Sequence, residues 1–195
     1  MLFPQVPLPL HIFEPRYRKM IADALAGPRV IGVALLRPGW EHDYHGRPPV
    51  YEQGCAGRIE QHEALPDGRS NIVLRGLTRF RIVEEHAGEL YRLAAVVPLA
   101  DAPADEAAAA AARREVMAAI GRAVDGPNLL VIKPDVPADV FVNALCQTLD
   151  LSAVERQSLL ECEGVLERYR RLLSILDFRQ LERGRRPGPS EPTVH

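Results

Sequence analysis

The residues best suited to metal chemistry lie in one short segment of the chain. Residues 41–45 read Glu-His-Asp-Tyr-His, which places two imidazoles and two carboxylates within five positions. Such groups bind divalent transition metals. The flanking Pro38-Gly39 and Gly46 predict a loop, however, and a loop does not hold two imidazoles on one face as a helix does. We therefore interpret the segment as a solvated polar loop and predict no metal site.

The common catalytic motifs are missing from the sequence. It contains no Gly-x-x-x-x-Gly-Lys-Ser/Thr phosphate loop, no Gly-x-Gly-x-x-Gly turn, no Gly-x-Ser-x-Gly elbow and no His-Glu-x-x-His helix. The serines lie in predicted turns, caps, helices or the tail, and none stands beside an obvious base. We expect no catalytic residue, no cofactor and no enzymatic activity. The alternative, a hydrolase that uses His42 and His45, would require a bound metal ion.

Three aromatic residues give the same loop, residues 37–54, a second potential role. Trp40, Tyr44 and Tyr51 could clamp a peptide, because aromatic side chains combine a large contact area with a polar group. They could equally fold back as a lid over the protein's own core. We predict a peptide-binding surface made of these three residues together with Leu2 and Phe3, on the expectation that all five are exposed.

Composition narrows the class of protein. The 195 residues carry a net charge of −2, with 47% apolar and 26% charged residues, as is ordinary for a globular protein. The near-neutral charge argues against nucleic-acid or anionic-membrane partners. Three scattered cysteines fit a reducing cytosol better than a disulfide framework. With no secretion signal and no long apolar run, we expect a cytoplasmic protein, and the arginine- and alanine-rich composition suggests a bacterial one.

The elements that would position these residues fall into two groups. Residues 1–100 predict a mostly antiparallel β-domain with one inserted helix at residues 14–26, where Pro15 favours a helix start. A continuous apolar run at residues 30–36 predicts a strand buried on both faces. The turn Pro66-Asp67-Gly68-Arg69 predicts a hairpin. The other predicted strands are residues 55–65, 70–77, 78–85 and 90–97.

After residue 100 the pattern becomes helical. Helices are predicted at residues 104–124, 137–149, 152–162 and 164–183, which would form a bundle over residues 101–184. Ser152 and Glu155 have the spacing of a capping box at the start of the third helix. The tail 185–195, which is rich in proline and arginine, is predicted to be disordered.

Several segments, in order along the chain, resemble a known family. Residues 9–20 (Pro-Leu-His-Ile-Phe-Glu-Pro-Arg-Tyr-Arg-Lys-Met) are similar to the signature near the start of the Lon protease N-terminal, or substrate-binding, domain family. Residues 54–59, 65–69, 74–82 and 159–161, and the long last helix, resemble later parts of that family. The matching structural residues are Phe13, Glu14, Pro15, Arg16, Tyr17, Asp67, Gly68 and Gly76.

The resemblance implies an α+β fold: a PUA-like β-pseudobarrel with an inserted short helix, followed by a C-terminal α-helical bundle. In the full protease this region helps to recognise protein substrates, so the expected partners are unfolded or exposed polypeptide segments. The chain resembles stand-alone bacterial members that lack the ATPase and protease domains, for which a separate protease is a candidate partner. The alternative, by analogy of fold alone, is an RNA-binding module with an arginine patch of Arg75, Arg79, Arg81 and Arg92.

The resemblance also sets expectations for single residues. Phe13 and Tyr17 should anchor the first helix to the sheet, Glu14 should cap that helix, and Arg16 should pair with a carboxylate or with backbone carbonyls. The family has another apolar strand before its first Leu-Phe-Pro element, which here begins at residue 2. Either the true start lies upstream of Met1, or the barrel lacks a strand; the second alternative would leave an exposed sheet edge.

Overall fold

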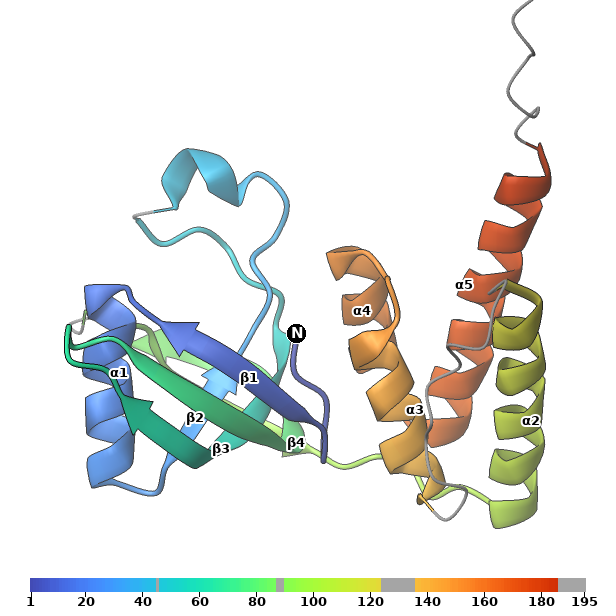
Figure 1. The fold of residues 1–195 in the computed structure, drawn as a ribbon, viewed down its shortest axis with the longest axis horizontal. Coiled ribbons are helices and arrows are strands. Elements are labelled where there is room, and N and C mark those ends of the chain that lie inside the picture. The colour runs from blue at the N-terminus through green and yellow to red at the C-terminus, as the bar shows by residue number, and fades with distance from the viewer. Residues whose placement is uncertain (45, 87–89, 124–135, 186–195) are drawn as a thin grey trace, which may run out of the picture.

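The structure, a computed structural model, describes residues 1–44, 46–86, 90–123 and 136–185. A twisted sheet with one helix against it lies beside a group of helices (Figure 1). The α+β class predicted from the sequence is therefore confirmed. The disordered tail was predicted for residues 185–195; Arg185 is helical, and residues 186–195 lie outside the described residues.

In the described ranges, five antiparallel strands form one sheet. They are β1 (Pro7–Ile12), β2 (Val30–Val33), β3 (Gln53–Ala64), β4 (Ser70–His86) and β5 (Leu93–Leu99). The order is β1-β4-β3-β2, with β5 also paired to β4. The first half of the long strand β4 pairs with β1 and its second half with β5. The segments predicted as two strands at 70–77 and 78–85 are thus one continuous element.

The predicted hairpin joins β3 to β4. Gly68 has a φ of +80°, which a residue with a side chain rarely adopts. The Asp67 carboxylate accepts a hydrogen bond from the Arg69 N–H at 3.0 Å, as in an Asx turn. The turn signal therefore placed this hairpin correctly.

Strand β2 corrects the prediction for residues 30–36. In the part of the chain that the structure describes, it lies at an edge of the sheet and pairs with β3 alone. Ile31 is buried, whereas Gly32 is exposed, so the strand is not buried on both faces. The apolar run has a different cause, since Val30, Ile31, Ala34 and Leu36 face a cavity described below.

Helix α1 (Pro15–Ala26) begins at Pro15 as predicted, and a short 3-10 helix, η1 (Trp40–Asp43), lies in the long loop. Ile21 is buried, and the half-buried Tyr17 packs against the core, as expected for an anchor. The expectation for Phe13 is wrong, because its side chain is 59% exposed and stacks on His11 with the ring centres 6.3 Å apart. Phe13 precedes the helix and points away from the core that Ile21 and Tyr17 reach.

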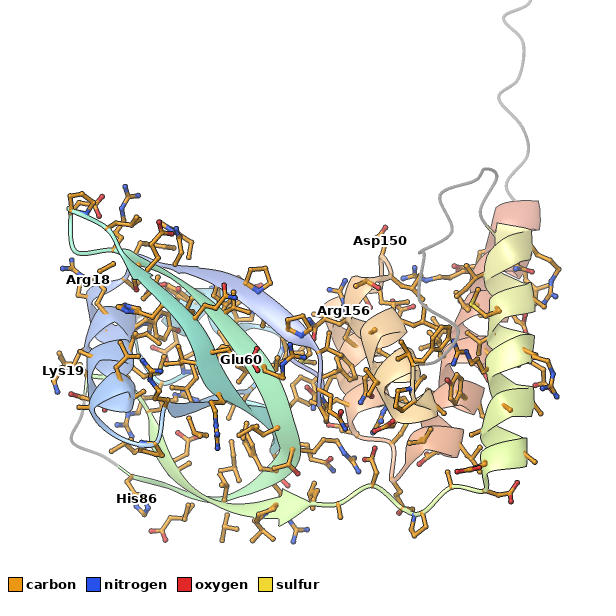
Figure 2. All side chains as sticks on the ribbon, turned by 60° about the horizontal axis from the view of Figure 1, so that its bottom comes forward. Arg18, Lys19, Glu60, His86, Asp150 and Arg156 are labelled. Atoms are coloured by element: carbon orange, nitrogen blue, oxygen red, sulfur yellow. The ribbon has the colours of Figure 1, made fainter. Side chains whose placement is uncertain are left out.

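The second group of elements consists of α2 (Glu106–Ala123), α3 (Ala138–Thr148), α4 (Ala153–Leu160) and α5 (Val165–Arg185). The predicted capping box of Ser152 and Glu155 is present at α4. Helix α5 continues through Gly184 to Arg185, beyond its predicted end. Helices α3 and α4 lie next to the sheet (Figure 1), and side chains fill the space between them and the strands (Figure 2). The division into units 1–100 and 101–184 stays a prediction.

Leu2 and Phe3 are fully buried, so the expectation that they are exposed is wrong. The Phe3 N–H donates to Gln147 Oε1 on α3 at 3.0 Å, and Asn143 Nδ2 donates to the Pro4 carbonyl at 3.1 Å. The first residues of the chain therefore fill the junction between sheet and helices. A Cβ at Gly76 would lie 2.0 Å from the Phe3 carbonyl oxygen, so this close approach requires glycine.

Two buried arginines meet at one carboxylate in the same junction. Arg79 of β4 lies 2.6 Å from Asp101 Oδ1, and Arg168 of α5 lies 3.0 Å from Asp101 Oδ2. Arg168 also donates to Asn143 Oδ1 at 2.8 Å, and Arg79 to the Leu160 carbonyl at 3.0 Å. Arg79 is only 3% exposed. It joins strand to helix, and the predicted arginine patch for RNA therefore lacks one of its four members.

Candidate functional site

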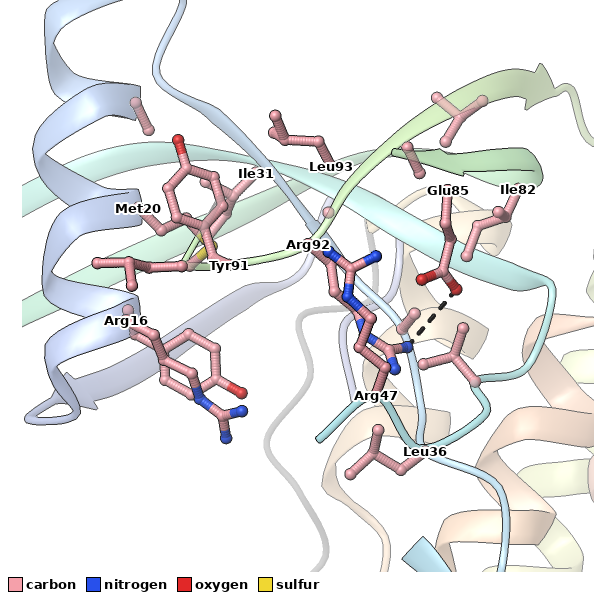
Figure 3. A pocket seen from close by; sticks show the side chains of 18 of the residues that line it. Arg16, Met20, Ile31, Leu36, Arg47, Ile82, Glu85, Tyr91, Arg92 and Leu93 are labelled. Carbon is pink, nitrogen blue, oxygen red and sulfur yellow. Dashed lines mark ion pairs between the residues drawn. The ribbon is translucent and has the colours of Figure 1, made fainter. Parts of the chain in front are cut away.

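A cavity of about 600 Å³ lies between α1, the sheet and the long loop (Figure 3). This volume is in the range of sites for small ligands or side chains. Its apolar surface comes from β2, β3, β4 and β5, through Ile31, Ala56, Phe80, Ile82 and Val96. Strands β2 and β5 are edge strands on opposite sides of β3 and β4. Because both line the same cavity, the sheet curls around it.

The strand register decides which residues reach the cavity. Ile82 pairs with Val96, and these two side chains lie on one face of the sheet. Their neighbours Arg81 and Val97 also pair with each other and lie on the opposite face. The Phe80 ring packs closely against the backbone of Gly54. A Cβ at Gly54 would lie 2.6 Å from this ring, so a side chain there would displace it. The alternation of side chains along β4 and β5 thus places Ile82 and Val96 toward the cavity and Arg81 and Val97 on the outer face of the sheet.

Glu14 connects α1 to the long loop on one side of the cavity. Its carboxylate accepts a hydrogen bond from Arg16 Nε at 2.9 Å and another from the Tyr44 hydroxyl at 2.6 Å. The Arg16 guanidinium lies over the rings of Tyr17 and Tyr44, 4.7 and 4.8 Å from their centres. The predicted pairing of Arg16 with a carboxylate is confirmed. The predicted capping by Glu14 is wrong, because its side chain makes no cap hydrogen bond and binds these two partners instead.

The hydrogen bond to Glu14 has an electrostatic consequence for Tyr44. The pKa of the Tyr44 hydroxyl is raised, chiefly because the neutral hydroxyl donates to this carboxylate and also because it is partly desolvated. The hydroxyl therefore remains a donor well above neutral pH.

The three aromatic residues of the loop are all half-buried. Tyr44 lines the cavity, and Trp40 packs against it with the ring centres 5.4 Å apart. Tyr51 does not line the cavity; the Arg37 guanidinium lies 5.6 Å from its ring centre. Tyr44 folds back onto the start of α1, as in the lid alternative. Contact between these residues and a peptide stays a prediction.

Two arginines that were not predicted for the peptide-binding surface, Arg47 and Arg92, lie on the other side of the cavity. Arg92 donates to the Pro48 carbonyl, and its Nη1 lies 3.5 Å from Glu85 Oε1. The Arg47 guanidinium approaches the His86 carbonyl at 3.4 Å. These contacts connect the loop after η1 with β4 and with the start of β5. No local motif marks the residues, since only the curl of the sheet brings loop and strand together.

Tyr91 fastens the start of β5 to α1. Its hydroxyl donates to Asp23 Oδ2 at 2.8 Å, and Lys19 also pairs with Asp23. The hydrogen bonds from Lys19 and Tyr91 hold the pKa of the Asp23 carboxyl below its ordinary value. Asp23 therefore carries a negative charge that Lys19 already balances.

Metal-binding clusters and reactive cysteines are the other candidates for chemistry in the described residues. In residues 1–44, 46–86, 90–123 and 136–185, no three His, Cys, Asp or Glu side chains are arranged to hold a metal ion, and His45 lies outside these ranges. Burial raises the pKa of the Cys55 and Cys146 thiols to about 12, which opposes formation of a reactive thiolate. Of the helices described, none has the length and apolar character needed to cross a membrane.

Comparison with known proteins gives one consistent family. The model of the ATP-dependent protease La (LON) substrate-binding domain matches residues 1–177. Lon protease 2 of Herpetosiphon aurantiacus is 30% identical over 187 residues, which cover 90% of this chain and 22% of that protein. Lon protease of Flavobacterium johnsoniae is 28% identical over 181 residues, which cover 86% and 21%. The chain therefore spans about a fifth of the length of these relatives.

Solved structures support the same fold. The N-terminal domain of Mycobacterium avium complex Lon protease matches with a TM-score of 0.64 at 21% identity, covering 91% of this chain and 92% of that chain. A Lon N-terminal domain protein from Xanthomonas campestris matches with a TM-score of 0.59 at 23% identity, covering 89% and 91%. At these identities the likeness is evidence for the fold.

Proposed function

The chain belongs to the family of Lon protease substrate-binding domains, and from this premise we propose that it is a non-enzymatic module that binds exposed apolar segments of polypeptides. The same premise supports the finer description of the sheet as a PUA-like pseudobarrel. The curl that brings β2 and β5 to one cavity is compatible with that description.

The observation that carries the proposal is the apolar strand beside the cavity. The sequence of β5 is Leu-Ala-Ala-Val-Val-Pro-Leu, without a charged residue, and all of it except Leu99 is exposed. Within the described residues β5 pairs with β4 alone, so its other edge is open. Proteins usually protect such edges with charged residues. An open, uncharged edge suits the addition of an extended peptide strand.

The cavity would give such a strand its side-chain contacts. Three apolar residues line the cavity and are also exposed to solvent: Leu90 is 70% exposed, Leu93 42% and Val96 44%. A peptide on the β5 edge would direct alternate side chains toward this surface. Backbone hydrogen bonds would then provide affinity without sequence preference, and the cavity would select apolar side chains.

The experiment uses two neighbouring valines that differ only in the face they occupy. Val96 and Val97 are each 44% exposed on β5, but Val96 lines the cavity and Val97 does not. Fluorescence anisotropy with labelled, reduced and carboxymethylated lactalbumin measures binding. We expect Val96→Arg to weaken binding roughly tenfold, since a charge replaces an apolar contact, and Val97→Arg to leave it within about twofold. Equal affinities for wild type and Val96→Arg would contradict the proposal.

A labelled single-stranded RNA serves as the second probe. The net charge of −2 and the burial of Arg79 both oppose RNA binding. We expect no saturable RNA binding at either 50 or 200 mM salt, roughly the range over which phosphate contacts would show a steep dependence.

A further inference from the structure

We propose that the cavity binds an apolar side chain that lies next to a carboxylate, and that Arg47 and Arg92 bind this carboxylate at the cavity mouth. The inference rests on the proposed function, because it names the chemical class of segment that the same cavity takes. The two sources of such a carboxylate are the α-carboxylate of a C-terminal residue and the side chain of a neighbouring Asp or Glu.

The charges that line the cavity are unevenly balanced. Arg16 is paired with Glu14 and Asp23 with Lys19, so these residues are neutralised by their own partners. At the mouth, Arg92 has Glu85 at 3.5 Å. The Arg47 guanidinium forms no ion pair with any of the residues that the structure describes. The mouth therefore has two guanidinium groups for one carboxylate.

The hydrogen bonds of these two arginines leave capacity for an anion. Among the described residues, Arg92 Nη1 has only the ion pair with Glu85 Oε1 at 3.5 Å and makes no hydrogen bond. The two terminal nitrogens of the Arg47 guanidinium, Nη1 and Nη2, each lie 3.4 Å from the neutral His86 carbonyl oxygen, which is longer than a strong hydrogen bond. A carboxylate would form shorter and stronger charge-assisted bonds with the same donors. Exchange of the carbonyl contact for a carboxylate is thus favourable.

The two arginines come from segments that face each other across the opening. Arg47 belongs to the loop after η1 and Arg92 to the segment before β5. Arg92 donates to the carbonyl of Pro48, the residue after Arg47, and forms the ion pair with Glu85 that is dashed in Figure 3, while Arg47 approaches the carbonyl of His86, the residue after Glu85. Ile82 and Leu93 line the same cavity, with Ile31 farther along the apolar wall. A ligand with its charge at the arginines would place an adjacent apolar group against this wall.

The test compares three fluorescein-labelled peptides of Gly-Ser sequence. One ends in leucine with a free carboxylate, one ends in leucine amide, and one carries an internal Leu-Asp pair and an amidated end. We expect the free acid to bind roughly tenfold more tightly than the leucine amide, the difference that hydrogen bonds to a charged group provide. If the internal Leu-Asp peptide also binds tightly, side-chain carboxylates qualify as ligands; if only the free acid does, the site reads chain ends.

Variants assign the effect to the two arginines. We expect Arg47→Gln and Arg92→Gln each to reduce the preference for the free acid while leaving affinity for leucine amide within about twofold, because charge is removed and the apolar wall is kept. Arg81→Gln is the matched control, since Arg81 is exposed on β4 at a position that faces away from the cavity. Arg47 is exposed, so its variant should fold even if Arg92→Gln lowers the melting temperature.

The outcomes separate this inference from the proposed function. Equal affinity for the three peptides, unchanged by Arg47→Gln, would overturn the carboxylate assignment. The polypeptide-binding proposal would stand if Val96→Arg still weakened lactalbumin binding. Absence of binding to both lactalbumin and the peptides would overturn both.

Discussion

The Tyr44 hydroxyl donates a 2.6 Å hydrogen bond to Glu14 Oε1, across 30 positions of sequence. This single contact fastens the long loop to the residue that precedes α1. Because Arg16 pairs with the same carboxylate and lies over the Tyr44 ring, the first helix and the loop form one wall of the cavity. The conspicuous Glu-Pro-Arg-Tyr segment is therefore a structural support for the site.

Removal of the Tyr44 hydroxyl should loosen this wall. We expect Tyr44→Phe to lower the free energy of unfolding by about 1 kcal/mol, the net value of one partly exposed hydrogen bond to a charged group. Urea denaturation measures the change. Tyr51→Phe is the control, because no hydrogen bond of the Tyr51 hydroxyl is present in the described residues and its ring remains to contact Arg37. A loss as large in the control would show that the hydroxyl of Tyr44 is not responsible.

The buried arginine cluster should matter far more than an exposed ion pair on the same strand. We expect Arg79→Met to destabilise the protein by about 3 kcal/mol or more, because it removes one of the two arginines that pair with Asp101 and leaves several buried carbonyls without a partner. Arg75, four residues earlier on β4, pairs with Glu60 at an exposed position. Arg75→Met should cost about 0.5 kcal/mol. Similar midpoints for the two variants in urea would refute the structural role of Arg79.

Truncation of two phenylalanines near the N-terminus should lower the free energy of unfolding by very different amounts. Phe3 is fully buried and Phe13 is 59% exposed. We expect Phe3→Ala to cost about 3–5 kcal/mol through lost burial and the cavity left behind. Phe13→Ala should cost about 0.5 kcal/mol, as for an ordinary surface change. Thermal unfolding of the two variants checks the assignment, which fails if Phe13→Ala is the more damaging.

The capping box of α4 predicts a pH dependence of stability. Burial raises the pKa of the Glu155 carboxyl, but hydrogen bonds from Ser152 and the nearby Arg179 outweigh it, so the pKa lies below its ordinary value of 4.5. A lowered pKa in the folded state means that the stabilisation is complete above about pH 4.5 and is lost as the pH falls through the folded-state pKa.

Glu155→Gln tests this dependence. We expect the variant to be less stable than the wild type by about 1 kcal/mol at pH 6, with a smaller difference at pH 3, because a larger fraction of the wild-type carboxyl is protonated there. The control is Glu115→Gln, an exposed residue of α2. Urea denaturation at both pH values gives the differences. A gap between wild type and Glu155→Gln that is the same at pH 3 and pH 6 would argue against the assigned role.

The sequence predicted the parts of this molecule that depend on short-range signals. Pro15, Asp67-Gly68 and the Ser152–Glu155 pair each determine a local backbone geometry, and the structure has a helix start, a hairpin and a capping box at these positions. The family resemblance rests in part on the segments around Pro15 and Asp67-Gly68, and it is confirmed by the match to residues 1–177.

What could not be predicted depends on which distant segments meet. The burial of Leu2 and Phe3 depends on distant residues, since Phe3 donates to Gln147 of α3. Arg47 and Arg92 carried no local motif, and only the curl of the sheet brings them to one cavity. The exposure of Phe13 was not predicted, because the resemblance implies that this residue anchors the first helix to the sheet.

The packing of the N-terminal residues against α3 also has a consequence for synthesis of the chain. The Phe3 N–H and its acceptor Gln147 are separated by 144 positions. Leu2 and Phe3 leave the ribosome before α3, yet the contact that covers Phe3 requires Gln147, which emerges 144 residues later. At roughly 5–20 residues per second, these side chains stay uncovered for about 7 to 30 seconds. The nascent protein therefore itself displays, for a short time, exposed apolar chain of the kind that we propose the finished protein binds.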